Sequence, residues 1–127
     1  MKKIIKTDDA PKAIGPYSQA VEANGFVFLS GQLPIDPASG AVLQGGIKDQ
    51  VRLVLENAKH ILAAAGCGLG QVVKATIYLK SMADFPAMNE VYGGVFPTDP
   101  PARATVEVAR LPKDVLIEMD FIAVKKN

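Results

Sequence analysis

The sequence predicts a single α+β domain in which two helices cover one face of a mixed sheet of about six strands. Three observations lead to this class. The chain has 127 residues, a size typical of one domain. Two segments carry apolar residues at helical spacing, and several others alternate with the period of strands. Two helices can cover one face of such a sheet, which leaves the opposite face without a covering layer.

The clearest turn lies in the N-terminal third. Asn24-Gly25 separates two apolar segments, Tyr17 to Ala23 and Phe26 to Gln32, and an Asn-Gly pair accepts the positive φ angles of a tight hairpin. Lys3 to Lys6 is expected to form a short strand before this hairpin. Pairing the two residues next to the turn predicts that one face carries four side chains: Tyr17, Gln19, Phe28 and Ser30.

The middle of the chain predicts a long helix followed by a strand. Ile47 to Ala65 has apolar residues at helical spacing, and Gly66 is placed to end the helix. Val72 to Lys80 alternates with period two, so one face should enter the core. The residues expected on that inner face are Val73, Ala75, Ile77 and Leu79.

A second helix is expected to start near Asp84 as its N-cap, with Pro86 in the first turn, and to end before Pro97. Its inward residues would be Phe85, Met88, Tyr92 and Val95.

The C-terminal part predicts a second antiparallel pair, formed by Ala104 to Ala109 and Val115 to Val124. One side of the last strand is apolar throughout, and the other mixes apolar residues with Glu118 and Asp120. Since monomers rarely expose large apolar patches, this second face of the sheet predicts a subunit interface or a pocket. We therefore expect a homo-oligomer.

Composition excludes several classes of protein. Fourteen basic and thirteen acidic residues give a net charge of +1, and no basic stripe stands out, which argues against nucleic-acid binding. No apolar stretch approaches the ~20 residues that span a bilayer. The N-terminus lacks the apolar stretch of a signal peptide, so a cytoplasmic protein is expected. One Cys and one His cannot supply a Cys/His zinc site, and no metal is expected.

Three familiar kinds of site are not supported by the sequence. His60 falls on the polar side of the long helix and is interpreted as a surface residue. Cys67 follows a helix C-terminus, where the dipole raises a thiol pKa, and is interpreted as structural. The glycines around it follow a helix and precede a strand, the reverse of a phosphate-binding turn.

Arg103, Thr105 and Glu118 form the more informative set. If a four-residue loop joins the C-terminal strands, these three residues share one face of the sheet. An Arg beside a carboxylate-rich strand is commonly a cross-strand ion pair. Alternatively, the guanidinium could hold a substrate carboxylate by two parallel hydrogen bonds while the Glu handles a proton or a water.

Several segments of the chain resemble the reactive intermediate deaminases, the RidA/YjgF family: Ala13-Ile14-Gly15-Pro16-Tyr17-Ser18-Gln19, Ser30-Gly31-Gln32-Leu33-Pro34, Asn89-Glu90-Val91-Tyr92 and Pro101 to Asp114. The resemblance implies a chorismate-mutase-like fold assembled as a homotrimeric barrel, with clefts between subunits. It also implies hydrolysis of enamines and imines, such as 2-aminoacrylate, 2-iminopropanoate and 2-iminobutanoate, to 2-keto acids and ammonia. Neither a cofactor nor a metal is implied.

Carried over by position, the resemblance implies that Arg103 binds the substrate carboxylate. It implies that Glu118 positions or activates the attacking water and assists proton transfer. It also implies that Tyr17 helps to order the water or to close the cleft. Many members have Cys where this chain has Thr105, which argues against a thiol nucleophile. The residues implied to line the site are Ser30, Gly31, Asn89 and Thr105.

Two other functions remain open at this point. The same cleft in a non-catalytic module would bind a small keto acid or amino acid and regulate a partner protein. A ribonuclease or translation inhibitor has been associated with relatives, but the near-neutral charge and the lack of a basic groove argue against it.

Overall fold

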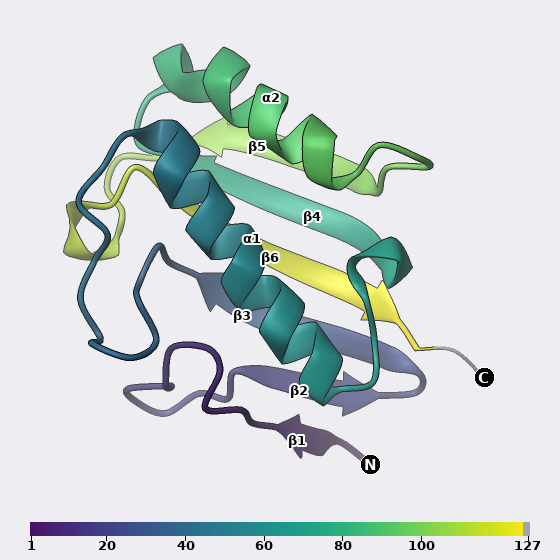
Figure 1. Ribbon diagram of the computed structural model, residues 1–127. Helices are drawn as coiled ribbons and strands as arrows, with labels where there is room; N and C mark the ends of the chain where they lie inside the picture. Colours follow the sequence, from purple (N-terminus) through teal and green to yellow (C-terminus); the bar gives the residue numbers. More distant parts are fainter. Residues whose placement is uncertain (126–127) are drawn as a thin grey trace.

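The computed structural model describes residues 1–125, which form one six-stranded sheet with two helices on one face (Figure 1). The strand order is β1-β2-β3-β6-β4-β5, and the sheet is mixed. The predicted α+β class, with two helices and about six strands, is confirmed. The elements in chain order are β1 (Lys3–Ile5), β2 (Ala20–Ala23), β3 (Phe26–Gln32), α1 (Ile47–Ala64), β4 (Val72–Leu79), α2 (Phe85–Val95), β5 (Ala102–Glu107) and β6 (Ile117–Val124).

The β2–β3 hairpin has the predicted turn. Asn24 and Gly25 have φ values of 51° and 80°, and Ala23 pairs with Phe26. However, β2 begins at Ala20, so the predicted strand position of Tyr17 is wrong. Two features upstream explain the shorter strand: Pro16 has no N–H to donate, and Gly15 has a φ of 135°.

Hydrogen bonds of the Gln19 side chain, and not strand pairing, hold the segment before the hairpin. Its amide Nε2 donates to the carbonyls of Thr7 and Pro11 at 3.0 and 2.8 Å, and its Oε1 accepts from the N–H of Thr7 at 2.8 Å. Only 4% of this residue is exposed. A buried amide with satisfied donors and acceptors thus fixes the N-terminal segment against β2.

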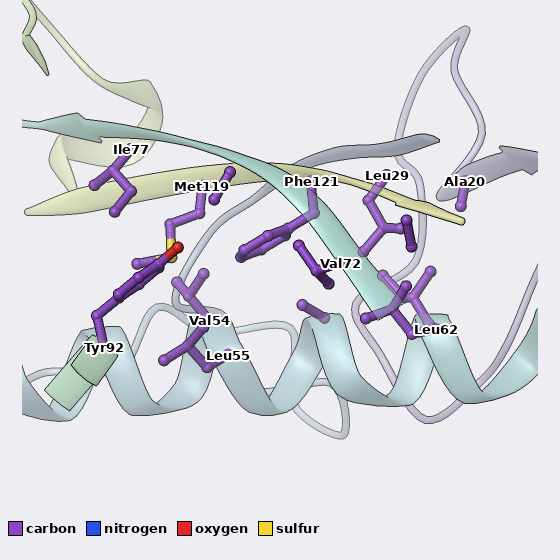
Figure 2. Close-up of a cluster of buried hydrophobic side chains, with 14 of the residues drawn as sticks. Ala20, Leu29, Val54, Leu55, Leu62, Val72, Ile77, Tyr92, Met119 and Phe121 are labelled. Carbon is purple, nitrogen blue, oxygen red and sulfur yellow. The ribbon is translucent and has the colours of Figure 1, made fainter. Parts of the chain in front are cut away.

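Both helices follow the sequence prediction. Helix α1 ends at Ala64, and Gly66 adopts the expected positive φ of 80°. Helix α2 starts one residue after Asp84, although the Asp84 side chain makes no capping hydrogen bond. Figure 2 shows how the inner sides of the helices meet the sheet in a core that includes Val54, Leu55, Leu62, Tyr92, Leu29, Ile77, Met119 and Phe121.

Strand β4 departs from the predicted alternation at its start. Its register against β6 shifts between Val72 and Lys74, which buries Val72 and exposes Val73. The prediction that Val73 enters the core is therefore wrong, because a bulge inverts the sides of the residues before it. From Ala75 onward, every second residue is buried as predicted.

Strand β5 has a different partner from the one predicted. It pairs in parallel with β4, and β4 lies between β5 and β6. Helix α2 provides the crossover that a parallel neighbour needs, and a 3₁₀ turn at Pro112–Asp114 leads back to β6. The expected antiparallel pair of the C-terminal strands is thus wrong.

The true pairing separates the residues expected on one face. Arg103 and Thr105 are in register with Ala75 and Ile77, on the side that faces the helices. Glu118 pairs with Tyr78 on the opposite side. The prediction that Arg103, Thr105 and Glu118 share a face is therefore wrong.

The face of the sheet without helices carries exposed apolar side chains from β1, β3, β5 and β6, which the two-sided pattern of the last strand predicts. These residues are Ile4, Phe26, Phe28, Val106 and Val124. Within residues 1–125, no helix combines the length and apolar character needed to cross a bilayer.

Candidate active site

The first cluster of predicted site residues lies where β5 meets α2. The guanidinium carbon of Arg103 is 5.5 Å from the ring centre of Phe85 and 4.9 Å from that of Tyr92. Its Nη1 donates to Oδ1 of Asn89 at 2.6 Å. The three helix residues recur at helical spacing and therefore share one side of α2. Two aromatic rings and one amide thus fix the direction of the guanidinium.

Arg103 has no carboxylate partner in the part of the chain that the structure describes: none of the ion pairs there involves it. The interpretation of Arg103 as a cross-strand ion pair is therefore wrong. Apart from Asn89, its remaining N–H groups have no acceptor among residues 1–125. A half-buried guanidinium in this state can bind a carboxylate by two parallel hydrogen bonds.

Two buried hydroxyl groups accompany Arg103. The Oη of Tyr92 and the Oγ1 of Thr105 have no hydrogen-bond partner within residues 1–125. Burial raises the pKa of Tyr92, although Arg103 opposes this, so the phenol stays neutral. Sequence reasoning assigned Tyr92 and Phe85 only to the core. Their spacing with Asn89 was the signal that could have placed them beside Arg103.

Replacing Tyr92 with Phe is expected to raise the free energy of unfolding by about 1 kcal/mol, because the ring remains while an unpartnered buried hydroxyl is lost. The matched variant Tyr92→Leu also loses the aromatic face and should lower that free energy by about 1–3 kcal/mol. Urea unfolding measures both changes. A Phe variant less stable than the wild type would contradict the assignment of a free hydroxyl.

The second cluster lies on β3 and β6. The register of β3 against β6 shifts between Leu29 and Gln32, and this bulge brings Gly31 under the carboxyl group of Glu118. A Cβ at position 31 would overlap Oε2 of Glu118 and lie 2.9 Å from its Cδ. Any residue larger than glycine at this position must therefore displace the Glu118 carboxyl group. Next to Gly31, the Ser30 hydroxyl donates to the carbonyl of Ser18 at 2.5 Å.

Glu118 lies in an environment that favours its protonated form. Burial raises the pKa of its carboxyl group, and the negative charge of Asp120 raises it further. No ion pair in the described chain involves Glu118. The group is therefore suited to exchange a proton nearer to neutral pH than an exposed Glu does.

Tyr17 and Gly31 line one cavity of about 550 Å³, together with Ile14 and Leu33. Tyr17 lies in the loop before β2 and is 53% exposed. Its Oη accepts a long hydrogen bond, 3.4 Å, from the N–H of Ile14. The structure therefore brings Tyr17 close to the Glu118 cluster through a loop and not through the predicted strand.

The predicted site residues thus form two separate clusters. Arg103, Asn89 and Thr105 lie on the helix side of the sheet at its β5 edge. The second cluster is centred on Glu118, on the opposite side of the sheet, and contains Ser30 and Gly31; Tyr17 adjoins it through the cavity that it lines with Gly31. Within one chain, a small ligand held by Arg103 is on the wrong side of the sheet to reach Glu118.

Gly31→Ala is expected to lower activity at the site by about tenfold or more, because the new methyl group must displace the Glu118 carboxyl. Gly70 provides a matched control, since a Cβ there meets nothing within 4 Å. Steady-state kinetics on Gly31→Ala and Gly70→Ala measure the difference. Equal activities in the two variants would show that the close approach of Glu118 is unimportant.

The remaining titratable candidates agree with their sequence interpretation. His60 is half-buried on α1 and lies 3.2 Å from Glu56. Cys67 is buried, and burial raises its pKa, which makes the thiolate less accessible. Among residues 1–125, no three His, Cys, Asp or Glu side chains are grouped to hold a metal ion.

Comparison with known proteins identifies the family. The family model described as Endoribonuclease L-PSP, which represents the YjgF/RidA proteins, matches residues 7–125 and so covers both clusters. The chain belongs to the RidA/YjgF family. Among its relatives, a RutC family protein of Pyrococcus horikoshii is 59% identical over 126 residues, covering 99% of this chain and 100% of the relative.

Two further members of the RidA/YjgF family are informative. A Thermotoga maritima structure, described provisionally as an endoribonuclease, has a TM-score of 0.97 and 51% identity, with 100% of both chains covered. TdcF of Escherichia coli is 47% identical over 128 residues, with 98% of each chain covered, and its name provisionally describes a reactive intermediate deaminase. Its crystal structure with bound serine has a TM-score of 0.93, with 98% of this chain and 99% of TdcF covered.

Proposed function

We propose that this protein hydrolyses reactive enamines and imines derived from amino acids, such as 2-aminoacrylate, 2-iminopropanoate and 2-iminobutanoate, to 2-keto acids and ammonia, without a metal or cofactor, in the cytoplasm. The observation that carries the proposal is the Arg103 guanidinium, which is oriented by Asn89 and two rings and has no carboxylate partner among residues 1–125. These substrates all carry an α-carboxylate. Serine, the amino acid in the TdcF structure, also carries one, which supports the same chemistry here.

We also propose that the working form is a homotrimer in which each site is completed by a second copy. Arg103 and Glu118 lie on opposite sides of the sheet, so one chain alone cannot place both against a small substrate. The apolar side chains exposed on the helix-free face support its burial against other copies. A symmetric closed assembly satisfies all copies of this face at once.

In the proposed reaction, the enamine first tautomerises to the imine. Arg103 fixes the carboxylate and so directs the C=N carbon toward Glu118 of the neighbouring copy. The Glu118 carboxylate takes a proton from the attacking water, whose oxygen bonds to that carbon as the C=N double bond becomes a single bond, and Glu118 passes this proton to the nitrogen. The tetrahedral amino alcohol then collapses: Glu118 takes the hydroxyl proton as the C=O bond forms, the C–N bond breaks, Glu118 gives that proton to the departing nitrogen, and ammonia leaves the 2-keto acid.

The other proposed residues organise this step. Tyr17 would order the water at the cavity that it shares with Gly31. Backbone groups at Gly31 and Thr105 are available to the water or the imine nitrogen. Ser30 and Asn89 act by holding their neighbours, through hydrogen bonds to Ser18 and Arg103 respectively. Orientation and proton transfer are the two contributions that this chemistry needs.

The test is to generate 2-aminoacrylate with a serine dehydratase and to follow imine decay by absorbance, with and without the protein. Faster decay, with release of ammonia, is the expected result. Unchanged decay accompanied by calorimetric binding of a keto acid would overturn the enzymatic proposal in favour of a regulatory binding module. Size-exclusion chromatography with light scattering should give the mass of three chains, and a monomer would contradict the shared site.

A further inference from the structure

A phenol and two carboxyl groups form a cluster on the helix-free face of the sheet. Tyr78 on β4 is directly opposite Glu118 on β6, and Thr76 is opposite Asp120. The Tyr78 hydroxyl reaches diagonally across the strands and donates to Oδ2 of Asp120 at 2.9 Å. Glu118 and Asp120 are two residues apart on the same strand, and all three members of the cluster are half-buried.

The two carboxyl groups receive unequal support. Asp120 accepts the phenol hydrogen bond, whereas no hydrogen bond to the Glu118 side chain occurs among residues 1–125. In that same part of the chain neither carboxyl takes part in an ion pair. A carboxylate oxygen accepts a hydrogen bond from a neutral phenol, so the geometry distinguishes the two groups: Asp120 has a hydrogen-bond donor within residues 1–125 and Glu118 has none.

The surroundings of Glu118 contain few other charges. Asp120 faces it from β6 and Tyr78 from β4, while Ser30 and Gly31 on the adjacent strand β3 are uncharged. In the homotrimer proposed above, Arg103 of a second copy would also face Glu118. That group is common to every variant used below, so differences between variants isolate the effect of the cluster.

We propose that Tyr78 and Asp120 are positioning residues that assign the mobile proton of the site to Glu118. The proposal rests on the deaminase function proposed above and deepens it. Tyr78 donates its hydrogen bond to Asp120, and the negative charge of Asp120 makes Glu118 the carboxyl group that takes the proton from the attacking water and later returns it. Neither residue needs to touch the substrate for this role.

The electrostatics of the cluster agree with this division of roles. The pKa of Glu118 is raised by burial and by Asp120. The pKa of Tyr78 is raised first by its hydrogen bond to Asp120, so the phenol remains a donor over the working pH range. A carboxyl group whose pKa lies closer to the working pH both accepts and returns a proton efficiently, which the two halves of the proposed reaction require.

Asp120→Asn tests the proposal through two independent readouts. Carboxyl ¹³C NMR follows the titration of Glu118 directly. The fall of kcat/KM at low pH, the acid limb of the pH profile, reports the protonation of Glu118 during catalysis. Removing the neighbouring negative charge should lower the Glu118 midpoint and shift the acid limb to lower pH by about 0.5–1 unit. Asp120→Glu, which keeps the charge, should leave the midpoint near that of the wild type. Glu56→Gln on α1 is the distant control, because it removes a surface carboxylate with no expected shift.

Tyr78→Phe tests the assignment of the proton separately, since it removes only the hydroxyl that donates to Asp120. Without that hydrogen bond the two carboxyls should share the proton, and their NMR titrations should broaden into two overlapping steps. Unchanged titrations in both Tyr78→Phe and Asp120→Asn would overturn the proposal even in an active enzyme. Conversely, shifted titrations in a protein that leaves imine decay unchanged would support the proton assignment and reject the deaminase function.

Discussion

Arg103→Ala is expected to lower kcat/KM for 2-aminoacrylate by about a thousandfold, because two charge-assisted hydrogen bonds to the substrate carboxylate, each worth about 1.5–3 kcal/mol, disappear together. Arg103→Lys keeps the positive charge but loses the planar fork and its stacking against Phe85 and Tyr92. We therefore expect Lys to lower kcat/KM by about tenfold to a hundredfold. The coupled dehydratase assay measures both.

A surface arginine provides the control for this prediction. Arg52 on α1 is largely exposed and pairs with Asp49 one turn away, at 3.4 Å. Arg52→Ala removes the same charge from the chain and should leave kcat/KM unchanged. If Arg103→Lys were as active as the wild type, a simple positive charge would suffice, and the orientation given by Asn89 and the two rings would have no catalytic meaning.

The elements defined by local pattern could be predicted from the sequence, whereas the long-range pairing could not. Asn24-Gly25 and Gly66 determine a turn and a helix end through their own φ preferences, so the turn of the hairpin and the end of α1 are predicted correctly, whereas the start of β2 is not. The pattern predicts a strand over Ala104 to Ala109, which the structure places at Ala102–Glu107, but it contains no information on the neighbour of that strand. The crossover through α2 makes that neighbour β4, which reverses the side on which Arg103 was expected.

The same limit applies to the candidate site. Motif resemblance selected Arg103 and Glu118 but could not show that they lie on opposite sides of one sheet. Tyr92 was found only as an inward helix residue, because its stacking on Arg103 depends on where β5 lies. The Tyr78–Asp120 hydrogen bond joins residues 42 positions apart and follows from the β4–β6 register. Only the fold therefore shows that the site residues form two separate clusters.

Glu118→Gln is expected to lower kcat for 2-aminoacrylate by about 10²–10³-fold, because the amide cannot take a proton from water or return it to the leaving nitrogen. The side chain keeps its shape above Gly31, so the close packing at the β3 bulge is preserved. KM should change little, since Arg103 still holds the carboxylate. The acid limb of the pH profile assigned to Glu118 should also disappear.

The control for this variant separates loss of chemistry from loss of structure. Glu90→Gln changes an exposed carboxylate whose ion pair is with Lys48 at 2.9 Å, and it should leave kcat unchanged. Calorimetric binding of a 2-keto acid to Glu118→Gln should match the wild type, because the carboxylate site is intact. If kcat stays within about threefold of the wild type while binding is normal, proton transfer does not pass through Glu118, and ordering of the water by Tyr17 and the backbone of Gly31 becomes the main catalytic contribution.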